Sequence, residues 1–132
     1  MTDADLVRRY LDAFNARDRD GMLDCVSDDV AHHVNQGGVR QGKTAFAGFL
    51  AHMDARYEET LKGIVILTGP PGRVAAEFTV HGTYRATDAG LPEATGQTYV
   101  LPAGAFYTVR DGRIARVAVH YDLADWTRQV GG

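Results

Sequence analysis

Apolar residues in the first part of the chain recur with the period of a helix. Leu6, Tyr10 and Phe14 are spaced four residues apart, which puts them on one helical face. Thr44 is a candidate N-cap for a later stretch in which Phe46 and Tyr57 belong to a second apolar stripe. The pattern predicts three helices, over residues 3–16, 18–26 and 44–57.

Further along, the period shortens to that of β-strands. Residues 74–84 alternate between apolar and polar positions, and Asp111-Gly112 is typical of a hairpin turn. Residues 98–109 are apolar at both sets of positions, as expected for a central strand covered on both faces. We predict strands over residues 28–35, 64–68, 74–84, 98–109 and 113–122, and a short helix after residue 122.

Helices early and an antiparallel meander late predict an α+β fold. With 132 residues, the chain fits one domain, spanning 1–132. A curved sheet wrapped around three helices would leave a concave apolar pocket, where a small ligand would bind.

Composition narrows the partners and the compartment. The net charge of −3 and the lack of a basic run argue against nucleic acid. No apolar run approaches the ~20 residues of a membrane helix. The single cysteine, Cys25, rules out an internal disulfide and fits the reducing cytoplasm, where we expect the protein.

Two adjacent histidines stand in the segment "HHVNQGG". His32 shares a strand face with Val30 and Val34, the face that the helices should cover, whereas His33 points the other way. The pair therefore cannot readily hold one metal ion, and we expect no metal site. His32 is a candidate proton donor or acceptor. The alternative is a core histidine satisfied by a backbone carbonyl or by the Tyr10 hydroxyl.

Longer segments resemble a known superfamily. "YLDAFNARDRDGMLDCVSDDVAHHV" (10–34), "VRDGRIARVAVHYD" (109–122), "DLADWTRQVG" (122–131) and "GQTYVLPAGAF" (96–106) are similar to nuclear transport factor 2-like proteins. This group includes ketosteroid isomerase and the SnoaL-like polyketide cyclases, and the isomerase-related branch looks nearest. The resemblance implies a cone-shaped α+β barrel, often a homodimer, with a cofactor-free pocket.

The family's catalytic groups transfer only in part. The oxyanion-donating tyrosine of the isomerase matches Tyr10, but its general base falls on Val34 and its second oxyanion donor on Gly104. Valine and glycine carry no proton to exchange, so isomerase activity by that mechanism is not expected. The base of the SnoaL-like cyclases matches Asp122.

The resulting hypothesis is a cofactor-independent acid–base enzyme acting on a small apolar carbonyl compound. The candidate catalytic residues are His32, Tyr10 and Asp122. Substrate-binding candidates are Asn35, Phe14, Val34, Tyr99, Gly104, Phe106, His120 and Trp126. The alternative is a non-catalytic ligand-binding or dimerisation module of the same fold.

Overall fold

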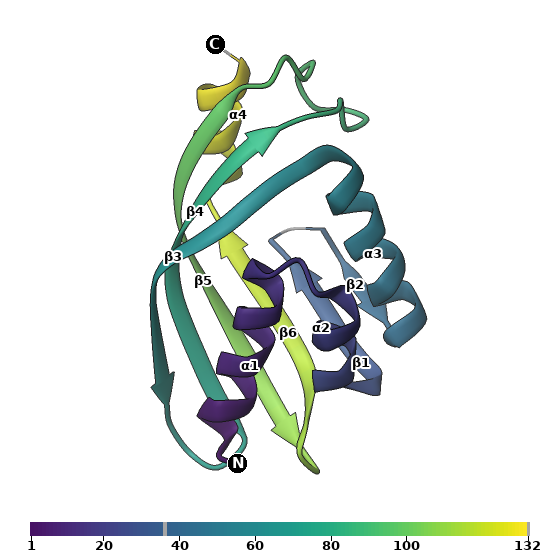
Figure 1. The fold of residues 1–132 in the computed structure, drawn as a ribbon, viewed down its shortest axis with the longest axis vertical. Helices are drawn as coiled ribbons and strands as arrows, with labels where there is room; N and C mark the ends of the chain where they lie inside the picture. Colours follow the sequence, from purple (N-terminus) through teal and green to yellow (C-terminus); the bar gives the residue numbers. More distant parts are fainter. Residues whose placement is uncertain (36, 132) are drawn as a thin grey trace.

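The computed structural model describes residues 1–35 and 37–131 and contains one six-stranded sheet with helices on one face (Figure 1). The helices are α1 (Asp3–Asn15), α2 (Arg19–Cys25), α3 (Lys43–Arg56) and α4 (Leu123–Gly131). The strands are β1 (Val26–Val34), β2 (Val39–Gln41), β3 (Tyr57–Thr68), β4 (Arg73–Tyr84), β5 (Thr98–Arg110) and β6 (Arg113–Tyr121). The predicted α+β architecture is confirmed.

The strand order is β2-β1-β6-β5-β4-β3, and the sheet is mixed. β1 runs parallel to β6, while the other neighbours are antiparallel. The two edge strands, β2 and β3, are not paired with each other, so the sheet is strongly curved but open rather than a closed barrel (Figure 1). Helices α1, α2 and α3 lie on its concave face, and α4 lies at one end, beside β5.

Local sequence explains where most elements begin. Thr2 and Asp5 form a capping box at the start of α1, with the Thr2 Oγ1 accepting from the Asp5 amide at 3.1 Å. The N-cap of α3 is Gly42, with φ of 94°, so Thr44 lies inside the helix and its predicted capping role is wrong. The short strand β2 was not predicted, because three residues carry too little periodicity.

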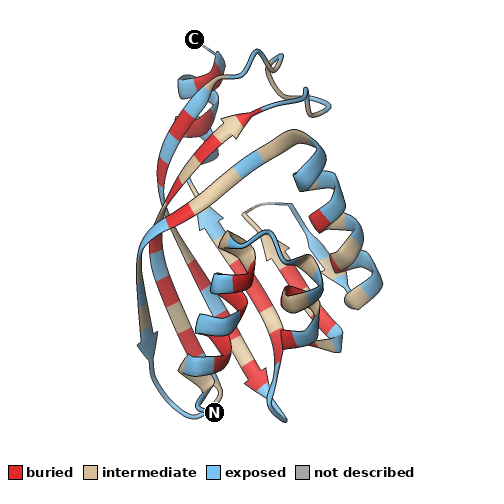
Figure 2. Cartoon of the chain, in the orientation of Figure 1, coloured by how far each residue is buried: buried red, intermediate tan, exposed pale blue. Residues whose placement is uncertain are grey.

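The two faces of the sheet differ in burial (Figure 2). In β5, Tyr99 and Tyr107 point toward the helices and are buried, whereas Val100 and Phe106 on the other face are 49% and 47% exposed. The prediction that β5 is covered on both sides is therefore wrong for the single chain. Its outward residues are apolar but not buried, because α1, α2 and α3 all lie on the concave side of the sheet.

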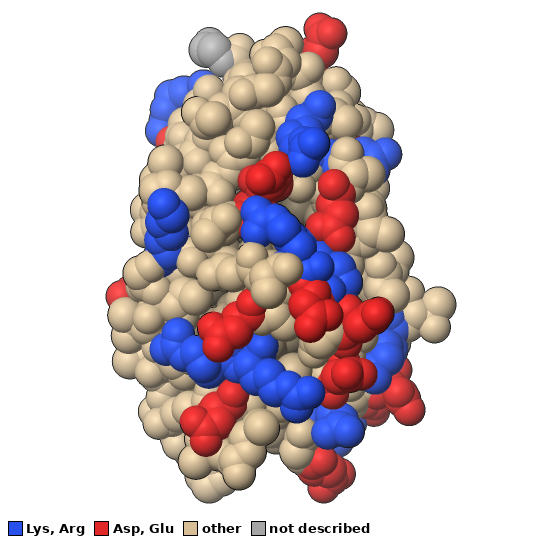
Figure 3. All heavy atoms as spheres, viewed as in Figure 1, with Lys and Arg blue, Asp and Glu red and all other residues tan. Residues whose placement is uncertain are grey.

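Charged side chains are interspersed on the face seen in Figure 3. Arg19 pairs with Asp54, joining α2 to α3, and Arg85 pairs with Glu58 at 2.8 Å. Among the described residues, no helix has both the length and the apolar character needed to cross a membrane.

Gly82 provides a test of the packing between β4 and β5. It lies opposite Tyr99, and a Cβ added at Gly82 would overlap the Tyr99 ring. That ring is 2% exposed and cannot move cheaply. We expect Gly82→Ala to lower the free energy of unfolding by about 1–3 kcal/mol, measured by urea denaturation.

Gly48→Ala is the matched control. Gly48 is exposed in α3, and nothing lies within 4 Å of its added Cβ. Alanine there should raise the free energy of unfolding by about 0.5–1 kcal/mol, because it reduces the freedom of the unfolded chain. Equal stabilities of the two variants would contradict the packing argument.

Candidate functional site

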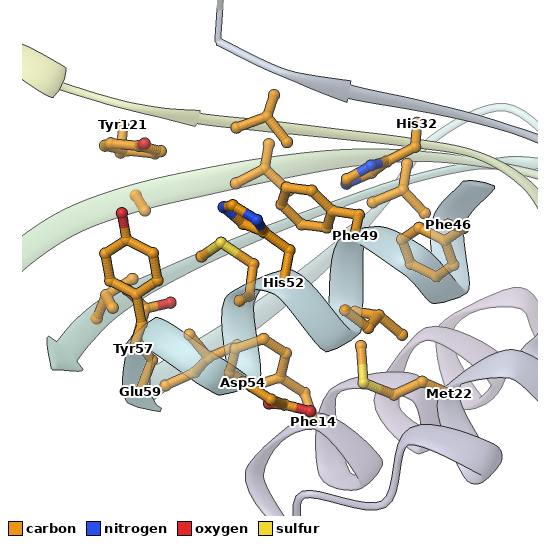
Figure 4. A pocket seen from close by; sticks show the side chains of 18 of the residues that line it. Phe14, Met22, His32, Phe46, Phe49, His52, Asp54, Tyr57, Glu59 and Tyr121 are labelled. Atoms are coloured by element: carbon orange, nitrogen blue, oxygen red, sulfur yellow. The ribbon is translucent and has the colours of Figure 1, made fainter. Parts of the chain in front are cut away.

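A cavity of about 280 Å³ lies between the concave face of the sheet and the helices (Figure 4). Its walls are mostly apolar and come from α1, α3, α4 and the inward residues of the strands. Representative wall residues are Phe46, Phe49, Leu101, Val117 and Val119. A largely apolar cavity with a few polar groups is typical of a site for a small organic ligand.

His32 projects into this cavity from β1, as the alternation of the strand predicts. It is 2% exposed, and its ring meets Phe46 and Phe49 edge-on, with centroids 4.8 and 4.6 Å away. Its Nδ1 is buried with no hydrogen-bond partner among the described residues, so the satisfied core histidine is not supported at this atom. Burial lowers the pKa of His32 to about 4, with Arg40 and His33 adding to the effect. The imidazole is therefore neutral at pH 7.

Tyr10 lines the same cavity from α1. It is 5% exposed, and its ring lies 5.9 Å from that of Tyr107 and 6.5 Å from that of Phe46. Burial raises the pKa of Tyr10 well above its usual value. The phenol thus keeps its proton and can serve as a hydrogen-bond donor.

Three of the predicted binding residues also line the cavity, namely Phe14, Val34 and Trp126. Trp126 is 4% exposed and packs edge-on against Tyr84 and Tyr99 at 5.1 and 5.9 Å. It therefore packs against neighbouring aromatic rings and forms part of the cavity wall.

Other predicted residues lie near the site without lining it. Tyr99 is buried in the core and contributes through its hydroxyl, which donates to Glu59. Asn35 ends β1 with φ of 46°, and its Oδ1 accepts from the Tyr121 amide at 2.8 Å. Asp122 is exposed and its carboxylate accepts from the Asp125 amide at 3.1 Å in the first turn of α4. Both polar groups stabilise chain turns.

Gly104, Phe106 and His120 lie on the outer face of the sheet, so the sequence assigned them to the wrong side. Side chains alternate along β5, and the cavity wall contains the neighbouring Ala103 instead of Gly104. Phe106 packs against His120 with ring centroids 5.7 Å apart, away from the cavity. The prediction for Gly104 is displaced by one residue along β5, and such a displacement turns the side chain to the opposite face of the sheet.

Glu59 was not among the site residues predicted from the sequence. This residue lies in β3 between Tyr57 and Leu61, which share its face and also line the cavity. Its Oε2 accepts from the Tyr99 hydroxyl at 2.6 Å. Burial raises the pKa of Glu59, while the bond from Tyr99 and the charge of Arg19 oppose the rise. The sequence signal was an acidic residue at a position that strand alternation places in line with the apolar Tyr57 and Leu61.

A polar cluster at one side of the cavity was also missed. His52 Nε2 lies 3.0 Å from Asp88 Oδ1, and the Tyr57 hydroxyl donates to Asp88 Oδ2 at 2.7 Å. Burial by itself would raise the pKa of Asp88, but the bonds from Tyr57 and His52 outweigh it, and the pKa is lowered. His52 is exposed on α3, and nothing in the local sequence reveals its contact with Asp88, which lies 36 residues further along the chain.

Arg40 is a third missed residue, on the short strand β2. It lines the cavity and is the Cα partner of His32 across the sheet. Its guanidinium lies over the Phe49 ring, 4.6 Å from the centroid. Its Nη1 is buried without a hydrogen-bond partner among the described residues.

His33 is separated from His32 by the pleat, as predicted, and does not line the cavity. Across residues 1–35 and 37–131, no three His, Cys, Asp or Glu side chains gather as metal ligands would. The chemistry that the site offers directly is hydrogen bonding and proton transfer by His32, Tyr10 and Glu59.

Comparison with solved structures confirms the fold. Two candidate polyketide cyclases are similar over nearly their whole lengths. The protein from a Silicibacter species is 57% identical, with 97% of this chain and 94% of that chain covered and a TM-score of 0.95. The one from Pseudomonas putida is 51% identical, with 98% of both chains covered and a TM-score of 0.97.

A more distant structure has the same fold. It is a Catenulispora acidiphila protein of ketosteroid isomerase-like fold in complex with trimethylamine, 17% identical, with 99% of this chain and 95% of that chain covered and a TM-score of 0.79. Among curated proteins, no relative matches the chain. Residues 7–117 match the model of the SnoaL-like domain. The chain therefore belongs to the SnoaL-like family.

Proposed function

We propose that the protein is a cofactor-independent enzyme that moves a proton on a small, largely apolar carbonyl compound. The reaction would be an isomerisation, a dehydration or an aldol-type cyclisation. The observation that carries the proposal is the neutral His32 imidazole, which projects with Tyr10 into a largely apolar cavity. Both can donate a hydrogen bond to a carbonyl oxygen, which makes the adjacent C–H bond more acidic.

The roles divide according to protonation. Because its pKa is lowered to about 4, neutral His32 is a weak base but an effective uncharged donor. A carboxylate whose pKa is raised accepts protons more strongly, and Glu59 is such a group. His32 and Tyr10 would therefore polarise the carbonyl, and Glu59 would take the proton. His32 and Glu59 both line the cavity and lie at different ends of the view in Figure 4.

The relatives support this chemistry. Two of the similar structures are candidate polyketide cyclases, and ring closure of a polyketide begins with removal of a proton beside a carbonyl. The alternative is a binding module without turnover, supported by Val34 at the position of the isomerase base. The following experiment separates these two functions.

Hydrogen–deuterium exchange at carbon tests the proposed chemistry without a known product. Cyclic and aryl ketones are incubated with the protein in D₂O, and loss of the α-proton signal is followed by NMR. We expect catalysed exchange for at least one ketone. Glu59→Gln and His32→Gln should each lower its rate by about 10²–10⁴-fold, since each removes a group engaged in proton transfer.

His33→Gln is the matched control, because His33 neighbours His32 in β1 but does not line the cavity. It should exchange at the wild-type rate. Wild-type exchange by both cavity variants would disprove the assigned roles. Absence of exchange for every ketone, with ligand binding intact, would favour the binding module.

The protonation of His32 predicts how stability depends on pH. Because burial depresses its pKa to about 4 from an ordinary 6.5, the unfolded chain binds the proton first as the pH falls. His32 therefore destabilises the fold progressively from pH 6.5 toward pH 4. Between pH 7.5 and pH 5, its contribution to the loss in unfolding free energy should be about 2 kcal/mol.

Urea denaturation at both pH values measures this contribution. His32→Leu has no titrating group at this position and should lose about 2 kcal/mol less than wild type on acidification. His33→Gln should retain most of the wild-type loss, because His33 is the smallest of the three causes that lower the pKa of His32. An identical pH dependence of wild type and His32→Leu would show that His32 is not held neutral in the folded protein.

We also propose a homodimer that uses the outer face of the sheet. Leu67, Ala75, Phe106 and Ala118 follow one another across four strands as successive Cα partners. Leu67 and Phe106 are 55% and 47% exposed. A continuous apolar row of this kind is typical of a protein interface.

The free, buried Cys25 is consistent with the reducing cytoplasm, which we propose as the location.

Phe106→Glu tests the dimer. A carboxylate at the centre of the apolar row would be desolvated on association, so we expect the variant to elute as a monomer under conditions in which wild type is a dimer. Light scattering coupled to size exclusion gives the masses. Ala51→Glu, on the exposed side of α3, is the control and should remain dimeric. A monomeric wild type would disprove the proposed assembly.

A further inference from the structure

Arg40 differs from Arg19, the other arginine among the residues that line the cavity. Arg19 is paired with Asp54 at 2.6 Å. Within the described ranges, Arg40 makes no ion pair, and its Nη1 is buried without a hydrogen-bond partner. Arg40 as a whole is partly buried, but a guanidinium stays charged in proteins, and a buried N–H of a charged group without a partner is costly.

The position of Arg40 is well defined by its surroundings. It pairs with His32 across β1 and β2, and its guanidinium lies 4.6 Å from the centroid of Phe49. The His32 ring lies 4.6 Å from the same centroid. Arg40 and His32 thus both contact Phe49, and each has a buried nitrogen with no partner among the described residues. Two nitrogen atoms without hydrogen-bond partners, both beside Phe49, could bind a polar group of a ligand.

The charges around the cavity indicate which charge the polar group of the ligand carries. Asp54 is already paired with Arg19, Asp88 lies 3.8 Å from Arg56, and the Glu59 carboxyl is bonded to Tyr99. No carboxylate of the described residues is within ion-pair distance of Arg40. The two planar N–H pairs of a guanidinium match the two oxygens of a carboxylate.

We propose that the substrate carries a carboxylate, which Arg40 binds, while its apolar body fills the cavity beside Phe49 and Tyr10. This inference rests on the proposed function only in calling the ligand a substrate. The substrate class is then a small alicyclic or aromatic keto acid. His32 keeps its proposed role of donating to the carbonyl oxygen of the same molecule, and its uncharged imidazole does not repel Arg40.

Binding of two shape-matched ligands tests the carboxylate site. Cyclohexanecarboxylate and cyclohexanecarboxamide have the same apolar body and differ in charge. Trp126 is the protein's single tryptophan and lines the cavity, and neither ligand absorbs where tryptophan is excited, so its fluorescence reports occupancy. At pH 7.5, we expect the carboxylate to bind on the order of tenfold more tightly than the amide. Acetate, which lacks the apolar body, should bind more weakly than cyclohexanecarboxylate.

Variants of Arg40 assign the preference to this residue. Arg40→Gln should bring the affinity for the carboxylate down to that for the amide, whose own affinity should change little. Arg40→Lys keeps the charge and should retain part of the preference. Arg73→Gln, which removes an exposed charge at the start of β4, is the matched control and should bind as wild type does.

Three results would overturn the proposal. These are equal affinities of wild type for the two ligands, a preference that survives in Arg40→Gln, and an equal loss of both ligands in that variant. The proposed reaction is judged separately by the exchange of α-protons. A carboxylate preference without exchange supports this site in a binding protein, whereas exchange that depends on Glu59, without the preference, overturns the site and leaves the proposed reaction standing.

Discussion

Desolvation is the constraint on which the candidate site depends. The cavity is walled by apolar side chains, and burial favours the neutral form of each group that can change its charge. Burial lowers the pKa of His32 to about 4 and raises those of Tyr10 and Glu59. A guanidinium cannot lose its proton in a protein, so Arg40 stays cationic and is available to a ligand of opposite charge. The same apolar walls thus shift the pKa values of the candidate acid–base groups and leave Arg40 as the cation that would favour an anionic ligand.

The asymmetric covering of the sheet creates this environment. Three helices close the concave side, which buries the inward residues of β1 and β5 and leaves a cavity between them. The outer side has no helix and carries an apolar row centred on Phe106. Catalytic chemistry and association would therefore use opposite faces of the same strands. Since alternate residues point to opposite faces, each function can change with little effect on the other.

Periodicity accounts for what could be predicted and for one kind of error. Helical spacing correctly placed Tyr10 and Phe14 toward the cavity, and strand alternation correctly separated His32 from His33. Transfer from the family pattern put Gly104 at the site, whereas its neighbour Ala103 lines the cavity. A shift by one residue is invisible in an ungapped motif but reverses the direction of a side chain.

The sequence by itself determined the α+β class, the inward side of β1 and the absence of the isomerase's base from position 34, because these follow from local spacing and residue identity. Only the tertiary structure decided which distant groups meet. Asp88 reaches His52, and Tyr99 reaches Glu59, through the curvature of the sheet and the course of its loops. Arg40 became a candidate only when strand pairing set it beside His32, since the burial of a charge is a property of the packed molecule.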